Sequence, residues 1–132
     1  MKARRLTQLA ALFVVLAGCG GEESTGPQPG RLQLTISTPN SDDRAIALTI
    51  TGTVTDIRAV AGYQLYVRTM EDRTAIIVVP EGSATFPDGE TEVATLSVPD
   101  LRSAGDYSVA VIQGSGSDYE LRFGAGYAAH LR

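Results

Sequence analysis

The chain has 132 residues, of which 43% are hydrophobic and 20% are charged, which allows one domain with a modest core. Its 15 acidic and 11 basic side chains give a net charge of −4 at pH 7. This balance argues against nucleic acid as a partner, because binding to phosphates needs a basic surface. The single cysteine excludes a disulfide within the chain and a cysteine-rich metal site.

The first 18 residues have the three parts of a secretory signal peptide. Basic residues open the chain, residues 9–17 form a short apolar stretch, and the small residues Ala17 and Gly18 follow it. The apolar stretch is shorter than the about 20 residues that span a bilayer. A helix packed in the domain core is the alternative, but this stretch lacks the polar face that such a helix would show.

The tetrapeptide Leu16-Ala17-Gly18-Cys19 completes this leader and resembles the processing site of bacterial lipoprotein precursors. The resemblance covers residues 1–19. It implies cleavage between Gly18 and Cys19, a diacylglyceryl group on the Cys19 sulfur, and acylation such as palmitoylation of the new amino terminus. Several acyl chains anchor a protein firmly in a membrane, because each buried methylene contributes about 0.8 kcal/mol.

The same resemblance implies a location in the cell envelope, with the membrane bound through the lipid on Cys19. In Gram-negative lipoproteins an aspartate after the cysteine favours retention in the inner membrane. Gly20 stands there in this chain and favours the outer membrane over the inner membrane. Cleavage would leave eight Arg against 15 acidic residues, a net charge of −7, which mainly confers solubility.

Residues 20–30 contain no large apolar side chain and are rich in Gly, Pro and Glu. Such a segment cannot bury enough surface to offset the entropy of ordering its chain. We therefore expect a signal peptide over residues 1–18, a lipidated cysteine and flexible tether over residues 19–30, and a folded domain over residues 31–132.

From Arg31 onward hydrophobicity repeats every second residue, which is typical of half-buried strands. We expect no helix after the leader. Turns are expected at residues 39–43 and around the later Pro and Gly clusters, and Gly114-Ser115-Gly116-Ser117 predicts a hairpin loop. The expected strands lie near residues 32–36, 46–50, 54–60, 63–67, 74–79, 92–98, 107–111, 119–123 and 127–131.

Short strands at this spacing predict an all-β fold, an antiparallel two-sheet sandwich of about 7–9 strands. A small closed barrel is the alternative. Residues 74–79 are apolar on both faces, which indicates a central strand.

Residues 96–109 resemble the corner between the fifth and sixth strands of immunoglobulin-like domains. There a strand ends, a loop crosses between the sheets, and a tyrosine, here Tyr107, opens the next strand. Gly105 stands where that family often has Gly or Ala, and Ser103 stands where it favours Asp. The resemblance implies a hydrogen bond from the Tyr107 hydroxyl to the backbone upstream. A tyrosine opening any core strand is the alternative reading.

Residue types that carry catalysis are scarce. His130 is the only histidine, whereas a Ser-His-Asp site needs an oriented imidazole and zinc sites draw on several His or Cys ligands. The acidic pairs Asp42-Asp43 and Glu71-Asp72 and the triplet Asp88-Gly89-Glu90 fall in predicted turns, where calcium could bind, but they match no calcium-loop motif. We therefore expect no catalytic site, no cofactor and no metal.

A binding surface is the remaining candidate. If Tyr63 and Leu65 face the core, then Tyr66 and Arg68 face outward, and Tyr and Arg are the residue types that anchor interfaces. Packing of Tyr66 on its cross-strand neighbours is the alternative. We expect a non-catalytic envelope module that binds a protein or serves assembly, its envelope partner unknown. A glycan or calcium capture module and a structural spacer are the alternatives.

Overall fold

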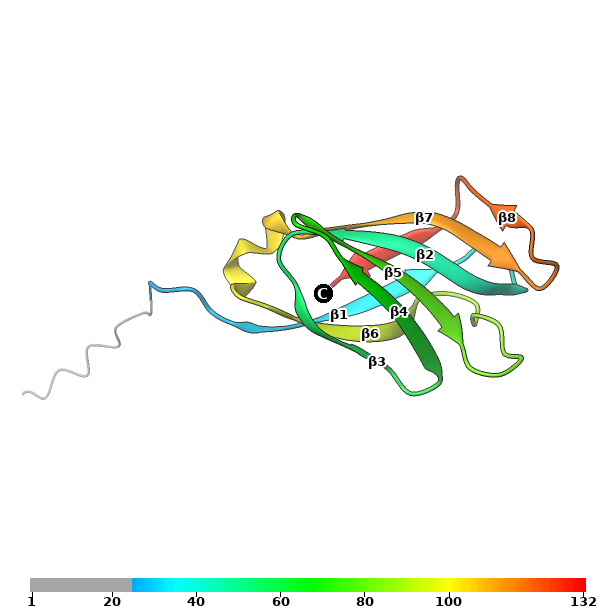
Figure 1. Ribbon diagram of the computed structural model, residues 1–132, viewed down its shortest axis with the longest axis horizontal. Helices are drawn as coiled ribbons and strands as arrows, with labels where there is room; N and C mark the ends of the chain where they lie inside the picture. The colour runs from blue at the N-terminus through cyan, green and yellow to red at the C-terminus, as the bar shows by residue number, and fades with distance from the viewer. Residues whose placement is uncertain (1–24) are drawn as a thin grey trace, which may run out of the picture.

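A computed structural model describes residues 25–132 (Figure 1). The predicted signal peptide, its cleavage site after Gly18, and Cys19 lie outside these described residues. Within them, no helix is long and apolar enough to cross a membrane. The elements between residues 25 and 132 are β1 (Gly30–Ser37), β2 (Asp43–Thr51), β3 (Thr55–Ala59), β4 (Tyr63–Thr69), β5 (Arg73–Pro80), β6 (Thr91–Val98), the 3₁₀ helix η1 (Leu101–Asp106), β7 (Ser108–Gly116), β8 (Leu121–Arg122) and β9 (Ala128–Leu131).

The strands form two antiparallel sheets that enclose one core. The four-stranded sheet has the order β3-β6-β1-β9, and the five-stranded sheet has the order β4-β5-β2-β7-β8. The predicted two-sheet sandwich is confirmed, and β5 lies inside its sheet between β4 and β2, as its apolar sequence indicated. Figure 1 shows the strands of both sheets running along the long axis of the molecule.

The core is built from alternate residues of the strands, as the period of two requires. In β2, for example, Ile46, Leu48 and Ile50 are buried, while the residues between them face away from the core. The fully or nearly fully buried apolar residues are Leu34, Ile36, Ile46, Leu48, Ile50, Val54, Ile76, Val78, Phe86, Val93, Ala94, Leu96 and Val98.

The connection from β6 to β7 contains a helix that the sequence did not predict. The Asp100 side chain caps η1 by accepting a hydrogen bond of 3.0 Å from the Arg102 backbone N–H and one of 3.2 Å from the Ser103 hydroxyl. The helix crosses from one sheet to the other and leads to Tyr107, as the resemblance implied. The Tyr107 hydroxyl, however, forms no hydrogen bond within residues 25–132, and its ring lies against Gly52 instead.

The prediction of a hairpin loop at residues 114–117 is wrong. Gly114 and Gly116 belong to β7, where they pair with Ile46 and Asp43 of β2, and the turn comes later, around residues 117–120. The glycines serve packing here, since a Cβ at either position would overlap a side chain that crosses over the strand. Glycine therefore indicated a close approach and not a turn.

The predicted inward faces of two strands also differ from the structure. The return strand β8 is only two residues long, and Tyr119, Leu121 and Phe123 are all exposed. In β4, Tyr63 and Leu65 pack against the core as expected, but Val67 is exposed. Val67 lines a hollow of about 380 Å³ together with Thr55 and Ile57 of β3, so the facing sheet leaves it partly uncovered. The periodicity of the sequence does not reveal how closely a facing strand covers an inward side chain.

The ordered domain begins before Arg31. The Gln28 backbone N–H donates to the Asp100 carboxylate at 3.0 Å, and the Gln28 carbonyl accepts from the Leu101 N–H at 2.7 Å. Gly30 already pairs with Val98. The predicted tether over residues 19–30 therefore extends too far toward the domain.

Candidate functional site

The outer face of the five-stranded sheet is apolar and exposed. Tyr66 of β4 lies opposite Ile77 of β5, which lies opposite Ala47 of β2, which in turn lies opposite Gln113 of β7. Tyr66 is 60% exposed and Ile77 is 45% exposed. This row crosses four of the five strands without a charged residue.

Small residues leave the centre of this face slightly hollow. One hollow of about 230 Å³ is lined by Arg44, Ala45, Val79, Ser115, Gly116 and Tyr119. A second, of about 120 Å³, is lined by Ala45, Ala47, Ile77, Gln113, Gly114 and Ser115. The two hollows share Ala45 and Ser115, so they adjoin one another. Both are smaller than the about 300–1,000 Å³ of a typical small-molecule site.

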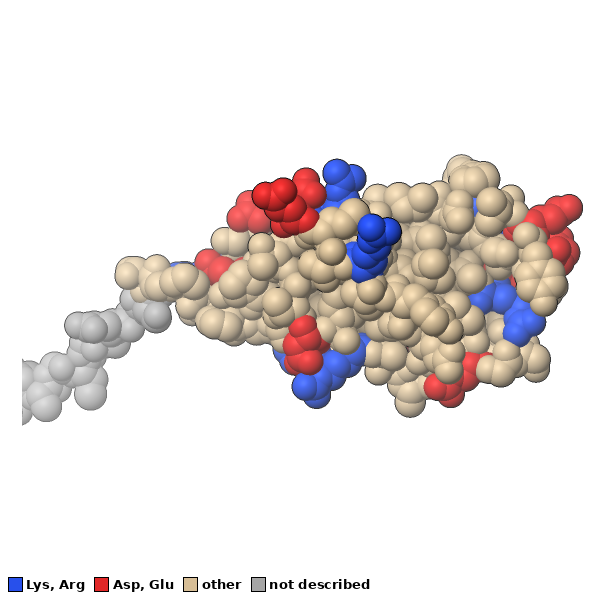
Figure 2. Space-filling model, in the orientation of Figure 1, with Lys and Arg blue, Asp and Glu red and all other residues tan. Residues whose placement is uncertain are grey.

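Charged side chains lie toward the rim of this face. Arg68 pairs with Ala75 and Arg73 pairs with Thr51, both toward the same end of the sheet. Figure 2 shows a broad area over the strands without Lys, Arg, Asp or Glu side chains, with the charged side chains gathered around it. An uncharged centre with a polar rim is the composition of many protein interfaces.

The outer face of the four-stranded sheet is polar. Arg31 donates to Asp56 at 2.6 Å, to the Thr95 hydroxyl at 2.7 Å and to the Ser97 hydroxyl at 2.9 Å. Arg58 donates to the same Asp56 carboxylate at 2.8 Å. These hydrogen bonds hold the pKa of Asp56 below its ordinary value, so the group stays ionised. The two outer faces therefore differ sharply in polarity.

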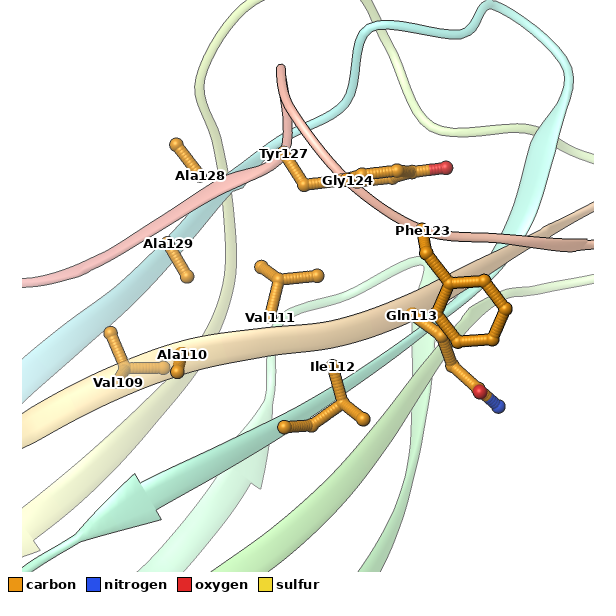
Figure 3. A pocket seen from close by; sticks show the side chains of 10 residues that line it. All are labelled: Val109, Ala110, Val111, Ile112, Gln113, Phe123, Gly124, Tyr127, Ala128 and Ala129. Carbon is orange, nitrogen blue, oxygen red and sulfur yellow. The ribbon is translucent and has the colours of Figure 1, made fainter.

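A third surface feature lies between the margins of the two sheets. A crevice of about 280 Å³ separates β7 from β9, with Val109, Val111 and Ala129 on its walls. Figure 3 shows Phe123 and Tyr127 toward one end of it, whereas the Ile112 side chain extends from β7 on the side opposite to Val111.

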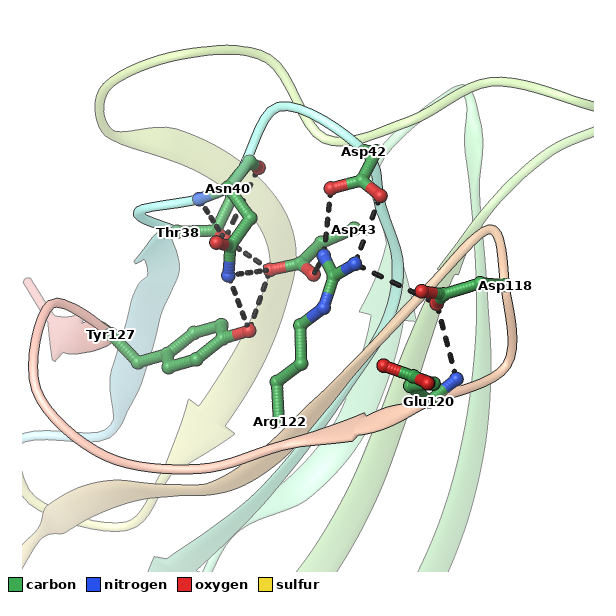
Figure 4. Close-up of polar contacts among 8 residues, drawn as sticks. All are labelled: Thr38, Asn40, Asp42, Asp43, Asp118, Glu120, Arg122 and Tyr127. Atoms are coloured by element: carbon green, nitrogen blue, oxygen red, sulfur yellow. Dashed lines mark hydrogen bonds and ion pairs between the residues drawn. The ribbon is translucent and has the colours of Figure 1, made fainter.

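A buried carboxylate organises one end of the sandwich (Figure 4). Asp43 is fully buried, and its Oδ2 accepts hydrogen bonds from Tyr127 at 2.7 Å, from Asn40 at 3.3 Å and from the Thr38 hydroxyl. Its Oδ1 accepts from Arg122 at 2.8 Å. Thr38 and Asn40 precede β2, whereas Arg122 belongs to β8 and Tyr127 directly precedes β9. This carboxylate therefore connects segments that are distant in the sequence.

One guanidinium, that of Arg122, serves several carboxylates of this cluster. Arg122 also donates to Asp42 through two nitrogens, at 2.7 and 2.9 Å. Burial raises the pKa of Asp43, but hydrogen bonds from Thr38, Tyr127 and the other donors outweigh burial and leave this pKa below its ordinary value. Hydrogen bonds to Arg122 likewise lower the pKa of Asp42. The cluster is a satisfied structural network.

The sequence placed Asp42 and Asp43 in a solvated turn, and for Asp43 this was wrong. Its carboxylate is fully buried, and both carboxylates already bind Arg122. A calcium ion at this turn would have to displace that guanidinium, which gives the calcium alternative no support here. Across residues 25–132, no group of three or more His, Cys, Asp or Glu side chains is placed to hold a metal ion.

The remaining residues singled out from sequence fall at separate places. His130 is exposed at the margin of the four-stranded sheet, with its Nε2 3.6 Å from Glu90. Tyr66 and Arg68 both lie on the outer face of the five-stranded sheet. The extent of that face was not predicted from the sequence. Two signals were available: the segment 74–79 is apolar on both faces of its strand, and Ala45 and Ala47 occupy outward positions of β2.

Comparisons with models of protein families, with curated proteins and with solved structures find no match for this chain. The function therefore has to be argued from the surfaces described above.

Proposed function

We propose that this protein is a lipid-anchored, non-catalytic module of the cell envelope that binds another protein through the outer face of its five-stranded sheet. The membrane attachment and the envelope location rest on the lipoprotein-like leader that ends at Cys19. The single observation that carries the binding role is the uncharged outer face centred on Ile77 and Ala47, set beside the polar outer face of the other sheet.

The difference between the two faces supports this choice. A sheet face that meets only water is normally lined by polar side chains. The four-stranded sheet follows that rule, with Arg31 and Arg58 bonded to neighbouring polar groups. The five-stranded sheet departs from it, and contiguous exposed apolar surface marks interaction sites. The occupant we propose is a folded protein that presents an uncharged, apolar surface of its own.

The chemistry of the face favours a protein over a small molecule or a glycan. The hollows are small, and Arg44 is the one charged residue among those that line them. Tyr66, on the edge strand β4, provides one exposed aromatic ring, which suits a protein interface anchored by tyrosine.

Photo-crosslinking in intact cells tests the proposal. A photoreactive phenylalanine analogue placed at Tyr66 should yield one discrete adduct with an envelope protein. Substitution of Ile77→Thr keeps a β-branched residue on the strand and should abolish that adduct without changing the thermal unfolding curve. Arg58→Thr, on the exposed outer side of the other sheet, is the matched control and should leave the adduct intact.

Two outcomes would overturn the proposal. One is the absence of any protein adduct at Tyr66 in cells where the chain is produced and folded. The other is an adduct that survives Ile77→Thr and is lost with Arg58→Thr. Hydrolysis of an envelope substrate by the purified chain would contradict the non-catalytic part.

A further inference from the structure

β7 is a strand with an open edge. On one side it pairs with β2 along its length, from Ser108↔Thr51 to Gly116↔Asp43. On the other side β8 pairs only with Gly114 and Ser115. The backbone N–H and C=O groups that residues 108–113 direct to that side pair with no strand within the described part of the chain. Such a row of unpaired groups is a template for another strand.

This edge also lacks the devices that protect other edges. No charged residue and no proline lies between Asp106 and Asp118. The three other margins carry charge: Arg68 lies in β4, Asp56 and Arg58 lie in β3, and β9 is followed by Arg132. Natural proteins use charged residues and proline to discourage strand pairing at edges. The β7 edge is therefore the margin best suited to accept a strand.

The crevice beside this edge provides a place for side chains. It runs between β7 and β9, has a volume of about 280 Å³, and is walled by aliphatic residues (Figure 3). A bulge in the pairing of β7 with β2 leaves Ile112 without a partner opposite it. Ile112 is 52% exposed beside this edge. Bulges re-aim side chains in this way.

We propose that the β7 edge pairs antiparallel with the β7 edge of a second copy of this chain, across a two-fold axis. Two-fold pairing brings the same surface of each copy together. Because residues 107–117 carry no charge, β7 meets itself without like charges opposite one another. Ile112 is exposed beside the open edge on each copy, so it lies at the seam between the two copies. The two five-stranded sheets become one continuous sheet.

This pairing does not depend on the proposed function, and it would widen the apolar face that the function uses. Two copies joined at β7 place their outer faces side by side on the same surface of the joined sheet. A partner that binds this face would then meet a surface from both copies.

Light scattering on the full chain, purified in detergent, tests the inference. The wild-type chain should have the mass of a dimer. Ile112→Lys should weaken the dimer about 100-fold or more, because an unpaired charge would be buried in the interface. Ile77→Lys places the same side chain on the centre of the outer face, where Ile77 is 45% exposed, and should leave the dimer intact.

Hydrogen exchange provides a second readout that does not depend on a variant. The backbone amides of residues 108–113 should become more protected as the wild-type concentration rises, and those of β4 should not. A folded wild-type chain that stays monomeric, or a dimer that persists in Ile112→Lys, overturns the proposal. A dimer broken by Ile77→Lys instead would show that copies meet through the outer face, which also overturns it.

Discussion

Asp43→Asn should destabilise the protein far more than the same change at the neighbouring Asp42. The amide has the shape of the carboxylate but no charge, and one of its two ends can no longer accept. In the wild type, Oδ2 of Asp43 accepts three hydrogen bonds and Oδ1 accepts one from Arg122. The Tyr127 and Thr38 hydroxyls can turn to accept from the amide and the Asn40 side chain can flip to do so, whereas Arg122 has only donors.

The magnitude follows from these contacts. A hydrogen bond to a charged group contributes about 1.5–3 kcal/mol net, and removal of one partner of a buried ion pair costs about 3–5 kcal/mol. Arg122 keeps its two bonds to Asp42, which places the loss near the lower end, at about 3 kcal/mol. For a domain of roughly 100 residues this corresponds to a fall in Tm of about 12 °C.

Chemical denaturation and calorimetry at pH 7 measure this loss, with Asp42→Asn as the matched control. Asp42 is about half exposed, at 49% of its side chain, so its replacement should cost much less. A cost below about 1 kcal/mol for Asp43→Asn would refute the reasoning, since no buried hydrogen-bonded carboxylate is lost so cheaply. Equal costs for the two variants would refute it as well.

The same carboxylate predicts a dependence on pH. The pKa of Asp43 is lowered in the folded state, so its contribution is present above the unfolded aspartate pKa of about 3.9. That contribution is lost as the pH falls through the folded-state pKa. The wild type should therefore lose more stability than Asp43→Asn between about pH 5 and pH 2. Parallel pH curves for the two proteins would contradict this assignment.

Two further substitutions test the packing. Gly114→Ala should lower the free energy of unfolding by about 1–3 kcal/mol in urea denaturation, because its Cβ would overlap the Tyr127 hydroxyl. Gly105→Ala is the control and should leave the free energy of unfolding unchanged, because no atom lies within 4 Å of its Cβ. Equal effects would show that Tyr127 moves aside freely. Leu96→Ala should cost about 2–5 kcal/mol because Leu96 is 0% exposed, whereas Leu121→Ala, at 59% exposed, should change stability by about 0.5 kcal/mol or less. A small cost at Leu96 would mean that the core closes around the cavity.

Much of the fold could be predicted because inward and outward side chains alternate along a strand, so hydrophobicity repeats every second residue. The alternation in residues 46–50 predicted β2 and its buried side, and the apolar residues 74–79 predicted a central strand. The errors came where one residue type has two uses. Gly114 and Gly116 suggested a turn but make room for crossing side chains, and Asp43 suggested a solvated turn but is buried.

The candidate site was only partly predictable for a similar reason. The alternation in β4 placed Tyr66 on an outward face, and the structure confirms that position. It could not indicate which outward residues of distant strands would share that face. Ile77, Ala47 and Gln113 join Tyr66 only through the register of three strand pairs.

The sequence by itself determined the strand periodicity, which is a property of neighbouring residues, and the acidic balance, which is a property of composition. Only the tertiary structure decided that one outer face is apolar and the other polar, that no strand of residues 25–132 pairs with most of the β7 edge, and that Asp43 is buried beneath Arg122 and Tyr127. These features arise from segments up to 84 residues apart, brought together by strand order and register. Local sequence patterns do not indicate the order or the register of the strands.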